Sequence, residues 1–295
     1  MQTVLITGAN GFAGYYLAQQ LLQKKYKVIA TGKGACRLLF QEQNFIYETM
    51  DFTNDESIKQ VFDKYYPQIV VHAGAMSKPD DCETAKDNAF LTNVTGTIYL
   101  LKHAAGLKNF FIFLSTDFIF EGTKLTYKED DIPGPVNYYG ETKLLAEGEV
   151  KRYGHDWSIV RTVLVYGHPK LGRQNILTTV ANALKKGETL NIFDDQVRTP
   201  TYVEDLASAI VSIIEKKAKG IFHISGKDVL TPYQMAVAVV EHLKLDKNGI
   251  NKVTAETFQQ PARRPSKTGF DISKARKELA FEPITFEEGL RRTFE

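Results

Sequence analysis

The stretch "TVLITGANGFAG", residues 3–14, decides the fold of this chain. A short apolar run is followed directly by glycines at positions 8, 11 and 14 and then by a helical pattern. Such glycines allow a tight turn and close approach of the backbone to a pyrophosphate, whose charge the helix N-terminus stabilises. A glycine triplet alone can be a plain turn, but this context favours a dinucleotide site. The loop residues predicted to bind are Gly8, Asn10, Gly11, Phe12, Ala13 and Gly14.

Strand and helix patterns alternate through the first half of the chain. Near-continuous apolar runs, typical of strands covered on both faces, occur at 3–7, 26–31, 44–50, 68–73, 110–115 and 157–165. Helical patterns lie between them at 12–24, 54–66, 83–104 and 138–152. Repeated βα units of this kind predict an α/β fold with a Rossmann-type, doubly wound parallel sheet.

The rhythm changes after Val165, and the last third is more polar and richer in loops. Helical patterns at 231–243 and 286–293 are separated by the turn-like stretch "QQPARRPSKTGF" (259–270). We predict an NAD(P)-binding Rossmann domain over 1–165, to which 196–226 returns. Residues 166–195 and 227–295 are predicted to form a smaller C-terminal α/β lobe that binds the substrate.

Composition and charge exclude several classes of function. The formal net charge is only +2 and no Lys/Arg-dense block stands out, so neither nucleic acid nor an anionic membrane is an expected partner. Cys36 and Cys82 have the spacing of neither a disulfide framework nor a zinc site, and no metal is predicted. The first strand follows the start of the chain without a signal-like segment, and no apolar run is long enough to span a bilayer. We therefore expect a cytoplasmic globular protein.

The end of the second strand bears on the choice of cofactor. An NAD site normally has a carboxylate there, bonded to the ribose 2′-hydroxyl, whereas "IATGKGACR" (29–37) has Lys33 and Arg37 nearby. These cations suit a 2′-phosphate and favour NADP(H) over NAD(H), unless both are merely exposed to solvent. After the third strand, Asp51 could bond the adenine amino group, with Phe52 beside it, or could cap the helix that starts near Asn54.

Polar side chains follow the fifth strand in "FLSTDFIF", residues 113–120. Ligands of open α/β sheets bind outside the carboxyl ends of the strands. Ser115, Thr116 and Asp117 are therefore expected on the rim where a nicotinamide would lie. Thr116 could bond a substrate oxygen there and share the path of a proton.

The stretch "NYYGETKLLAEGEV", residues 137–150, offers two tyrosines as a catalytic acid. Tyr139 and Lys143 are four residues apart and share one helix face, whereas Tyr138 is five residues from Lys143 and points elsewhere. A nearby ammonium lowers the pKa of a phenol, which is otherwise about 10. Lys143 could instead pair with Glu147 on a plain helix face. The glycine loop and the Ser-Thr pair favour the catalytic interpretation.

Together these motifs resemble the extended short-chain dehydrogenases/reductases, and within them the dTDP-4-dehydrorhamnose reductase (RmlD-like) family. The resemblance is carried by "TGANGFAG" (7–14), "LSTDFIFEG" (114–122), "NYYGETKLLAE" (137–147), "RTPTYVEDLA" (198–207) and "RRPSKTGFDISKARKEL" (263–279). It implies NAD(P)H-dependent reduction of the 4-keto group of a nucleotide-linked 6-deoxy sugar. In rhamnose biosynthesis this step converts dTDP-4-dehydro-L-rhamnose to dTDP-L-rhamnose. The implied catalytic triad is Thr116, Tyr139 and Lys143, with Tyr139 donating the proton to the C4 oxygen.

The resemblance also implies roles for further residues. The additional cofactor contacts are His72, Ala73, Gly74, Ala75, Asn93 and Ser115, joined by Tyr139 and Lys143. The implied substrate contacts are Thr116, Asp117, Asn175, Arg198 and Arg264, with the arginines directed at the nucleotide phosphates. His72 is otherwise a buried strand histidine, and the arginines could equally be surface or ion-pair residues.

Two local features narrow the reaction. Related dehydratases carry Thr-Asp-Glu, whereas Phe118 stands in the third position here, so dehydration is disfavoured. The tryptophan that the reductases carry in the segment "RTVLVYG" is replaced by Leu164. The alternatives are therefore another sugar-nucleotide reductase or epimerase, and a non-catalytic NAD(P)-binding regulatory subunit like the β subunit of methionine adenosyltransferase. Some family members bind magnesium at a dimer contact, but no ligands for it are assigned here, and a homodimer is left open.

Overall fold

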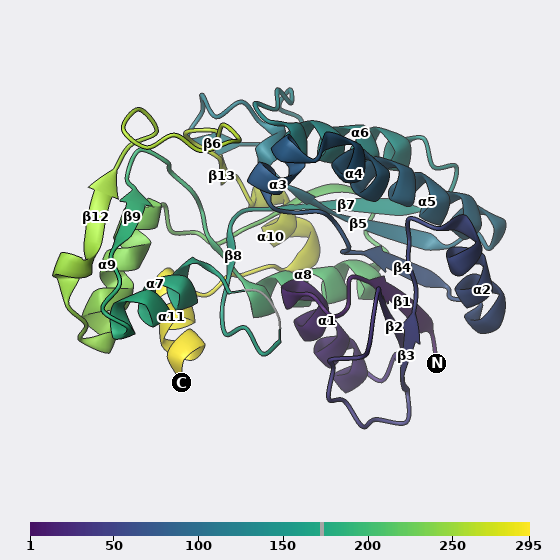
Figure 1. Cartoon of the computed structure of the whole chain (residues 1–295). Helices are drawn as coiled ribbons and strands as arrows, with labels where there is room; N and C mark the ends of the chain where they lie inside the picture. Colours follow the sequence, from purple (N-terminus) through teal and green to yellow (C-terminus); the bar gives the residue numbers. More distant parts are fainter. Residues whose placement is uncertain (172–173) are drawn as a thin grey trace.

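The computed structural model describes residues 1–171 and 174–295 and is built around one large parallel sheet (Figure 1). Its strands are β1 (Thr3–Thr7), β2 (Lys27–Gly32), β3 (Phe45–Thr49), β4 (Ile69–His72), β5 (Phe110–Thr116), β7 (Trp157–Thr162) and β11 (Gly220–Ile224). The strand order is β11-β7-β5-β4-β1-β2-β3, and every neighbouring pair is parallel. The order reverses between β1 and β4, which confirms the predicted doubly wound Rossmann-type sheet.

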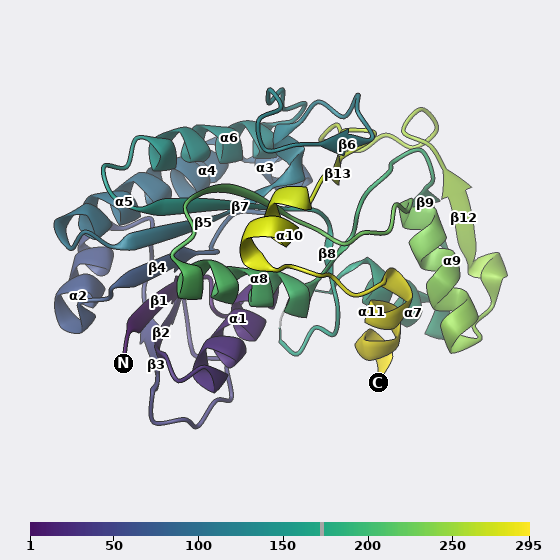
Figure 2. The same ribbon diagram turned by 180° about the vertical axis from the view of Figure 1, so that it is seen from behind.

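Helices cover both faces of this sheet, as the near-continuous apolar strands require. One face carries α2 (Asp55–Tyr65), α5 (Gly96–Gly106) and α6 (Tyr138–Lys151). The opposite face carries α1 (Phe12–Gln23), α8 (Val203–Lys216) and α10 (Ser273–Leu279), which are seen best in Figure 2. Alternate residues of β5 enter the two cores, with Phe111 and Phe113 under α5 and α6 and Ile112 on the other side.

The single helix predicted over 83–104 is wrong in detail. The segment forms α3 (Pro79–Thr84), α4 (Lys86–Phe90), a π-helical turn (Leu91–Thr95) and α5. Ala85 leaves helical geometry between the first two, at φ −130° and ψ 61°. The π turn inserts an extra residue in the helical ladder, a feature often found at functional sites. It directs Asn93 inward, where that side chain is buried.

The strand predicted over 157–165 is also interrupted. β7 ends at Thr162, and the chain turns away into β8 (Val165–Tyr166), which pairs with β10 (Thr201–Tyr202). At the break, the backbone N–H and the hydroxyl of Thr201 both donate to the carbonyl of Val163. Leu164, in this bend, has a φ of 32°, which is unusual for a branched residue.

The C-terminal part has an apolar core of its own. It contains α7 (Ile176–Lys185), α9 (Pro232–Leu243), α11 (Phe286–Phe294), and the paired strands β9 (Leu190–Phe193) and β12 (Ile250–Val253). These elements lie to one side of the large sheet in both ribbon views. In the described part of the chain, no helix is both long and apolar enough to cross a membrane.

Several short elements lie outside the large sheet. β13 (Gly269–Phe270) pairs with β6 (Thr126–Tyr127), and 3-10 turns occupy Asp117–Ile119 and Lys247–Gly249. The stretch predicted as a turn over 259–270 thus ends in a strand. We call residues 262–268, which precede β13, the strap.

Candidate active site at the carboxyl ends of the strands

Two glycines of the loop after β1, Gly8 and Gly14, lie where there is no room for a side chain. Gly8 has a φ of 70°, and a Cβ added there would lie 2.7 Å from the Cα of Gly74, which follows β4. A Cβ on Gly14 would lie 2.4 Å from the carbonyl oxygen of Gly8. Helix α1 has Gly11 as its N-cap, and this residue has no side chain that could cap the backbone N–H groups of the first turn, which begins with Phe12 and Ala13. Such uncapped donors fit the charge of a pyrophosphate.

Asn10 holds the loop that follows β2. Its Nδ2 donates to the hydroxyl of Tyr47 (2.8 Å) and to the carbonyl of Ala35 (3.0 Å), while its Oδ1 accepts from the backbone N–H of Arg37 (3.0 Å). The Arg37 guanidinium donates back to the Asn10 carbonyl at 2.8 Å. The side chain of Asn10 thus supports the position of Arg37 at the carboxyl end of β2.

Lys33 and Asp51 meet at the same edge of the sheet. Their charged groups form an exposed ion pair, with Lys33 Nζ 3.1 Å from Asp51 Oδ1. Asp51 also accepts from the backbone N–H and the hydroxyl of Thr53. The cap of α2 is Asn54, which accepts from the N–H of Ser57, so the alternative role of Asp51 as a helix cap is wrong.

Phe52 lies under the backbone that follows β4. A Cβ on Gly74 would lie 2.5 Å from its ring, and a Cβ on Gly96 would lie 2.7 Å from it. The ring is buried and also contacts His72 edge-on at 5.1 Å. Phe52 therefore packs directly against Gly74 from the inside of the molecule. The neighbours of Gly74, Ala73 and Ala75, are only partly buried.

His72 is a fully buried member of a hydrogen-bond chain. Its Nδ1 lies 2.6 Å from the hydroxyl of Thr7, which accepts from the N–H of Gly74, and its Nε2 lies 3.1 Å from the hydroxyl of Thr97. Thr97 donates its own proton to the carbonyl of Asn93 at 2.7 Å. All the hydrogen bonds of this network form when the His72 ring is neutral and carries its proton on Nε2. Burial lowers the pKa of His72 well below its usual value, which agrees with a neutral ring.

Asn93 continues this chain towards α6. Its Oδ1 accepts from the N–H of Met76 (2.8 Å), and its Nδ2 donates to the Met76 carbonyl (3.1 Å) and to the hydroxyl of Thr142 (3.0 Å). Thr142 donates to the carbonyl of Tyr139. The Asn93 amide thus ties the segment after β4 to the first turns of α6, and both of its ends are bonded to protein groups.

The end of β5 presents two hydroxyls of different character. Ser115 Oγ is buried and has no hydrogen-bond partner among the described residues. Thr116 Oγ1 accepts from the backbone N–H of Phe118 at 3.2 Å and donates to Asp117 Oδ1 at 3.1 Å. A buried hydroxyl without a partner is uncommon, so Ser115 fits a site completed by a bound group.

Helix α6 begins beside this strand end. Its N-cap is Asn137, which accepts from the N–H of Gly140 at 2.9 Å. A side chain on Gly140 would meet the carbonyl oxygen of Phe118 at 2.1 Å, so glycine lets the helix pack directly on the end of β5. Tyr139 packs edge-on against Phe118, with ring centroids 5.9 Å apart, whereas Tyr138 lies under the ammonium of Lys86. The two tyrosines therefore face different surroundings.

Lys143 lies inside the molecule with 2% of its surface exposed. Its ammonium is 3.9 Å from the ring centroid of Phe113. Among the described residues, Lys143 forms no ion pair with Glu147, the alternative that the sequence left open. Glu147 instead accepts two bonds from the buried Arg161 (3.0 and 2.8 Å). Burial lowers the pKa of Lys143 to about 7, against a smaller opposing effect of the Glu147 charge.

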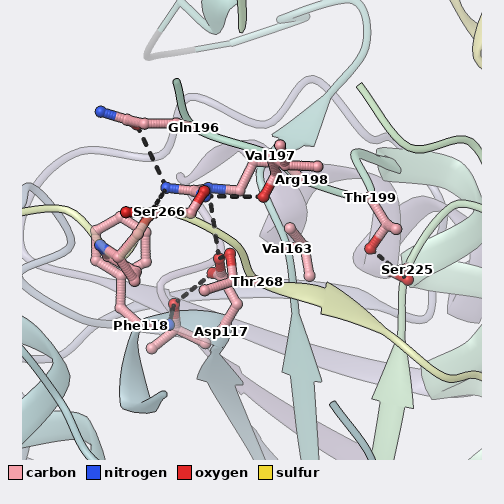
Figure 3. A network of polar contacts seen from close by, with 12 residues as sticks. Asp117, Phe118, Val163, Gln196, Val197, Arg198, Thr199, Ser225, Ser266 and Thr268 are labelled. Atoms are coloured by element: carbon pink, nitrogen blue, oxygen red, sulfur yellow. Dashed lines mark hydrogen bonds and ion pairs between the residues drawn. The ribbon is translucent and has the colours of Figure 1, made fainter. Parts of the chain in front are cut away.

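Arg198 and Asp117 lie together in a buried polar network, which is drawn in Figure 3. Arg198 Nε is 3.8 Å from Asp117 Oδ2, and the same carboxylate oxygen accepts from the hydroxyl of Thr268 at 2.5 Å. The Nη groups of Arg198 donate to the carbonyls of Pro265 (2.7 Å) and Ser266 (3.2 Å). Two further bonds go to the Val197 carbonyl and to Gln196 Oε1. In this arrangement the Arg198 guanidinium contacts only protein groups in the described part of the chain. This matches the alternative given from the sequence, in which Arg198 is an ion-pair residue.

The remaining predicted substrate residues are also engaged with protein. Arg264 makes a two-pronged ion pair with Asp80 at the start of α3, at 2.5 and 2.7 Å. Asn175 caps α7, accepting from the N–H of Leu177, and donates to the carbonyl of Gly167 at 2.6 Å. Asn175 therefore joins α7 to the segment after β8.

The strap is hydrogen-bonded to α3, to the N-cap residue of α6 and to the loop that follows β5. Asp80 also accepts from the N–H of Ala262 (3.0 Å), and Asn137 donates from Nδ2 to the carbonyl of Arg263 (2.7 Å). Further along, the N–H of Lys267 donates to the carbonyl of Gly122. Sequence reasoning missed Asp80 and Thr268, and no local signal could have found them because their partners lie more than 150 residues away.

Two other parts of the described chain bear on ligand binding. No three His, Cys, Asp or Glu side chains within residues 1–171 and 174–295 gather as a metal site. A hollow of about 170 Å³ lies at the amino ends of the strands, lined by Gln68, Lys108, Asp156 and Lys217 among others. It contains none of the predicted site residues, all of which belong to other parts of the molecule.

Comparison with known proteins shows the same architecture. Residues 1–295 match the family model of the RmlD substrate binding domain. The chain is 32% identical to the spore coat polysaccharide biosynthesis protein SpsK of Bacillus subtilis, covering 99% of this chain and 96% of that protein. It is 29% identical to methionine adenosyltransferase 2 subunit beta of Xenopus laevis, covering 98% and 86%. A crystal structure of dTDP-4-dehydrorhamnose reductase from Bacillus anthracis, in complex with NADP, matches with a TM-score of 0.88, 28% identity and coverage of 100% and 99%.

Proposed function

The chain belongs to the family of the RmlD substrate binding domain, and on this premise we propose that it is an NAD(P)H-dependent sugar-nucleotide reductase. Its substrate is a nucleotide-linked 4-keto-6-deoxy sugar, in the most specific form dTDP-4-dehydro-L-rhamnose, which it reduces to dTDP-L-rhamnose. The similarity over the full length to the NADP-bound rhamnose reductase of Bacillus anthracis supports this choice.

One observation carries the proposal beyond family membership. Tyr139 and Lys143 lie on the same helix, one turn apart, where α6 packs against the end of β5. The Lys143 ammonium is buried without a carboxylate in hydrogen-bond contact among the described residues, so its charge is available to stabilise a phenolate. In the proposed reaction Tyr139 gives its proton to the ketone oxygen, and Lys143 keeps the resulting phenolate stable.

The residues around the glycine loop fit a nicotinamide dinucleotide. The uncapped first turn of α1 would hold the pyrophosphate, and the buried Ser115 hydroxyl would gain a partner near the nicotinamide. Lys33 and Arg37 would bind a 2′-phosphate, which makes NADP(H) the proposed cofactor. The bound cofactor supplies the hydride, and the protein orients the ketone and supplies the proton.

Oxidation of NADPH, followed by absorbance, tests this function. Purified protein is mixed with dTDP-4-dehydrorhamnose and, in parallel, with a panel of other keto-sugar nucleotides. We expect turnover with at least one 4-keto-6-deoxy sugar nucleotide and none with nucleotide sugars that lack a ketone. Absence of turnover above background with the whole panel would refute the proposal.

A second candidate function follows from the similarity to a named subunit. Methionine adenosyltransferase 2 subunit beta is 29% identical over nearly the whole chain, so a cofactor-binding regulatory subunit is the alternative. That role requires a stoichiometric partner and NADPH binding without turnover. Isolation of such a complex, combined with no oxidation on any sugar nucleotide, would favour it, whereas turnover by the isolated chain argues against it.

A further inference from the structure

Asp117 has partners that belong to two distant parts of the chain. Its Oδ1 accepts from the hydroxyl of Thr116 at the end of β5, and its Oδ2 accepts from the hydroxyl of Thr268 at the end of the strap. Only 3% of the surface of Asp117 is exposed. One carboxylate thus bridges the proposed catalytic threonine and the C-terminal part of the chain.

These contacts fix the orientation of the Thr116 hydroxyl. One lone pair of Oγ1 accepts the N–H of Phe118, and the hydroxyl proton is directed at Asp117. A hydroxyl otherwise rotates to suit its surroundings. With both of these bonds made, Thr116 Oγ1 has one lone pair left, and that lone pair has one defined direction. It can accept a hydrogen bond from a donor on the proposed proton path, but the hydroxyl cannot donate to the ketone oxygen while it donates to Asp117. A fixed acceptor is the kind of preorganisation that a group on a proton path requires.

Arg198 links the same carboxylate to the backbone of the strap. Its Nη groups hold the carbonyls of Pro265 and Ser266, and its Nε faces Asp117 Oδ2 at 3.8 Å (Figure 3). A buried charge is costly unless it is paired and hydrogen-bonded. If the strap left its place, Arg198 would lose two acceptors and Asp117 would lose the Thr268 donor. The buried pair is therefore complete only while the strap is seated.

We propose that Asp117 and Arg198 are positioning residues that orient the Thr116 hydroxyl only while the strap is seated against them. Seating of the strap on the end of β5 thereby becomes a condition for turnover. The proposal rests on the proposed reductase function for the reaction that it governs, and on the hydrogen bonds alone for the coupling of strap and carboxylate.

Thr268 gives the sharpest test, because it lies outside the proposed catalytic and cofactor-binding residues. Thr268→Val keeps the shape and removes the donor, so we expect kcat to fall about tenfold through misplacement of Thr116, with KM for NADPH unchanged. Thr268→Ser restores the hydroxyl and should recover most of kcat. In a Thr116→Val background, Thr268→Val should cause no further loss, because it acts through Thr116. An unchanged kcat in Thr268→Val, or an equal loss in both backgrounds, would overturn the proposal.

Hydrogen–deuterium exchange tests the coupling without any substrate. The N–H groups of Lys267 and Thr268 donate to the carbonyls of Gly122 and Val197, so they report on seating of the strap. Asp117→Asn should accelerate their exchange about tenfold or more, as expected when the free energy needed for local opening of the strap falls by more than about 1 kcal/mol. Glu121→Gln, a neighbouring exposed carboxylate, should leave it unchanged.

The two measurements separate the two proposals. If the wild-type chain reduces no keto sugar, the reductase function fails. The exchange rates alone then test whether Asp117 is coupled to the seating of the strap. Unchanged exchange at Lys267 and Thr268 in folded Asp117→Asn protein refutes the pair, whatever the turnover.

Discussion

The Lys143 ammonium lies 3.9 Å from the ring centroid of Phe113, in the apolar layer between α6 and β5. A cation over an aromatic face gains electrostatic stabilisation, but it still loses most of its hydration. Burial is the larger effect here and lowers the pKa of Lys143 to about 7. The lysine that the proposed mechanism needs in its charged form therefore titrates near neutral pH.

This titration predicts a pH dependence of the reaction. Below about pH 7 the folded, cofactor-free protein holds Lys143 charged, and above that pH the ammonium loses its proton. Because kcat/KM reports the free enzyme, kcat/KM for NADPH should fall as pH rises above about 7. Measurement from pH 6 to 9 checks this.

Lys143→Arg provides the control for that profile. Arginine stays charged across the range, so any residual activity of this variant should lack the falling limb. A wild-type profile that stays flat up to pH 9 would contradict the assignment of the charged lysine.

Tyr139 and Tyr138 give a matched pair for the proposed acid. Tyr139→Phe should lose about 10²- to 10⁴-fold in kcat, the usual contribution of a general acid, while NADPH affinity is retained. Tyr138→Phe should keep kcat, because its ring lies under Lys86 and not against Phe118. Steady-state kinetics and NADPH titration check both, and a near-normal rate of Tyr139→Phe would remove that residue from the role.

The fold was predictable where the sequence is periodic and not where it depends on distant partners. Six apolar runs matched strands of the large sheet to within a few residues, because strands buried on both faces have a distinctive composition. The π turn at Leu91–Thr95 and the short strand β13 were missed. Their geometry comes from contacts with Met76 and with β6, which no local pattern encodes.

The candidate site was predictable in its elements but not in its bonding. Helical spacing alone separated Tyr139 from Tyr138, and the glycine spacing located the loop that packs on Gly74. The direction of a long side chain is decided by tertiary contacts. Arg198, which stays a prediction for the nucleotide phosphates, forms an ion pair with Asp117 and donates to a carbonyl of the strap, and neither contact follows from the sequence pattern.

Cofactor choice should respond to the two cations at the end of β2. Lys33→Ala and Arg37→Ala should each weaken NADPH binding about 10-fold or more while NADH changes little, because charge-assisted bonds to a 2′-phosphate contribute about 1.5–3 kcal/mol. The ratio of kcat/KM for the two cofactors checks this. Lys64→Ala, another exposed lysine paired with a carboxylate, serves as a control that should leave the ratio unchanged. An unaltered ratio in both Lys33 and Arg37 variants would dismiss a 2′-phosphate site.

Gly14 offers a test of the tight phosphate loop. Gly14→Ala places a methyl group 2.4 Å from the Gly8 carbonyl, and overpacking of this kind costs about 1–3 kcal/mol of unfolding free energy. NADPH affinity should fall as well, because the loop must shift. Gly106→Ala, at the end of α5 with open space around it, should be neutral or slightly stabilising. Chemical denaturation and NADPH titration distinguish the two, and equal behaviour would show that the close approach at Gly14 is unimportant.

Glu147 and Arg161 form a buried pair that should dominate the stability of α6 on the sheet. Both side chains are almost fully buried, and the guanidinium donates to both carboxylate oxygens. Glu147→Gln leaves the Arg161 charge without its counter-charge, so we expect a loss of about 3–5 kcal/mol in the free energy of unfolding. Glu149→Gln breaks an exposed pair with Arg152 on the same helix and should change it by less than about 0.5 kcal/mol. Urea denaturation measures both, and a loss below about 1 kcal/mol for Glu147→Gln would contradict the importance of the pair.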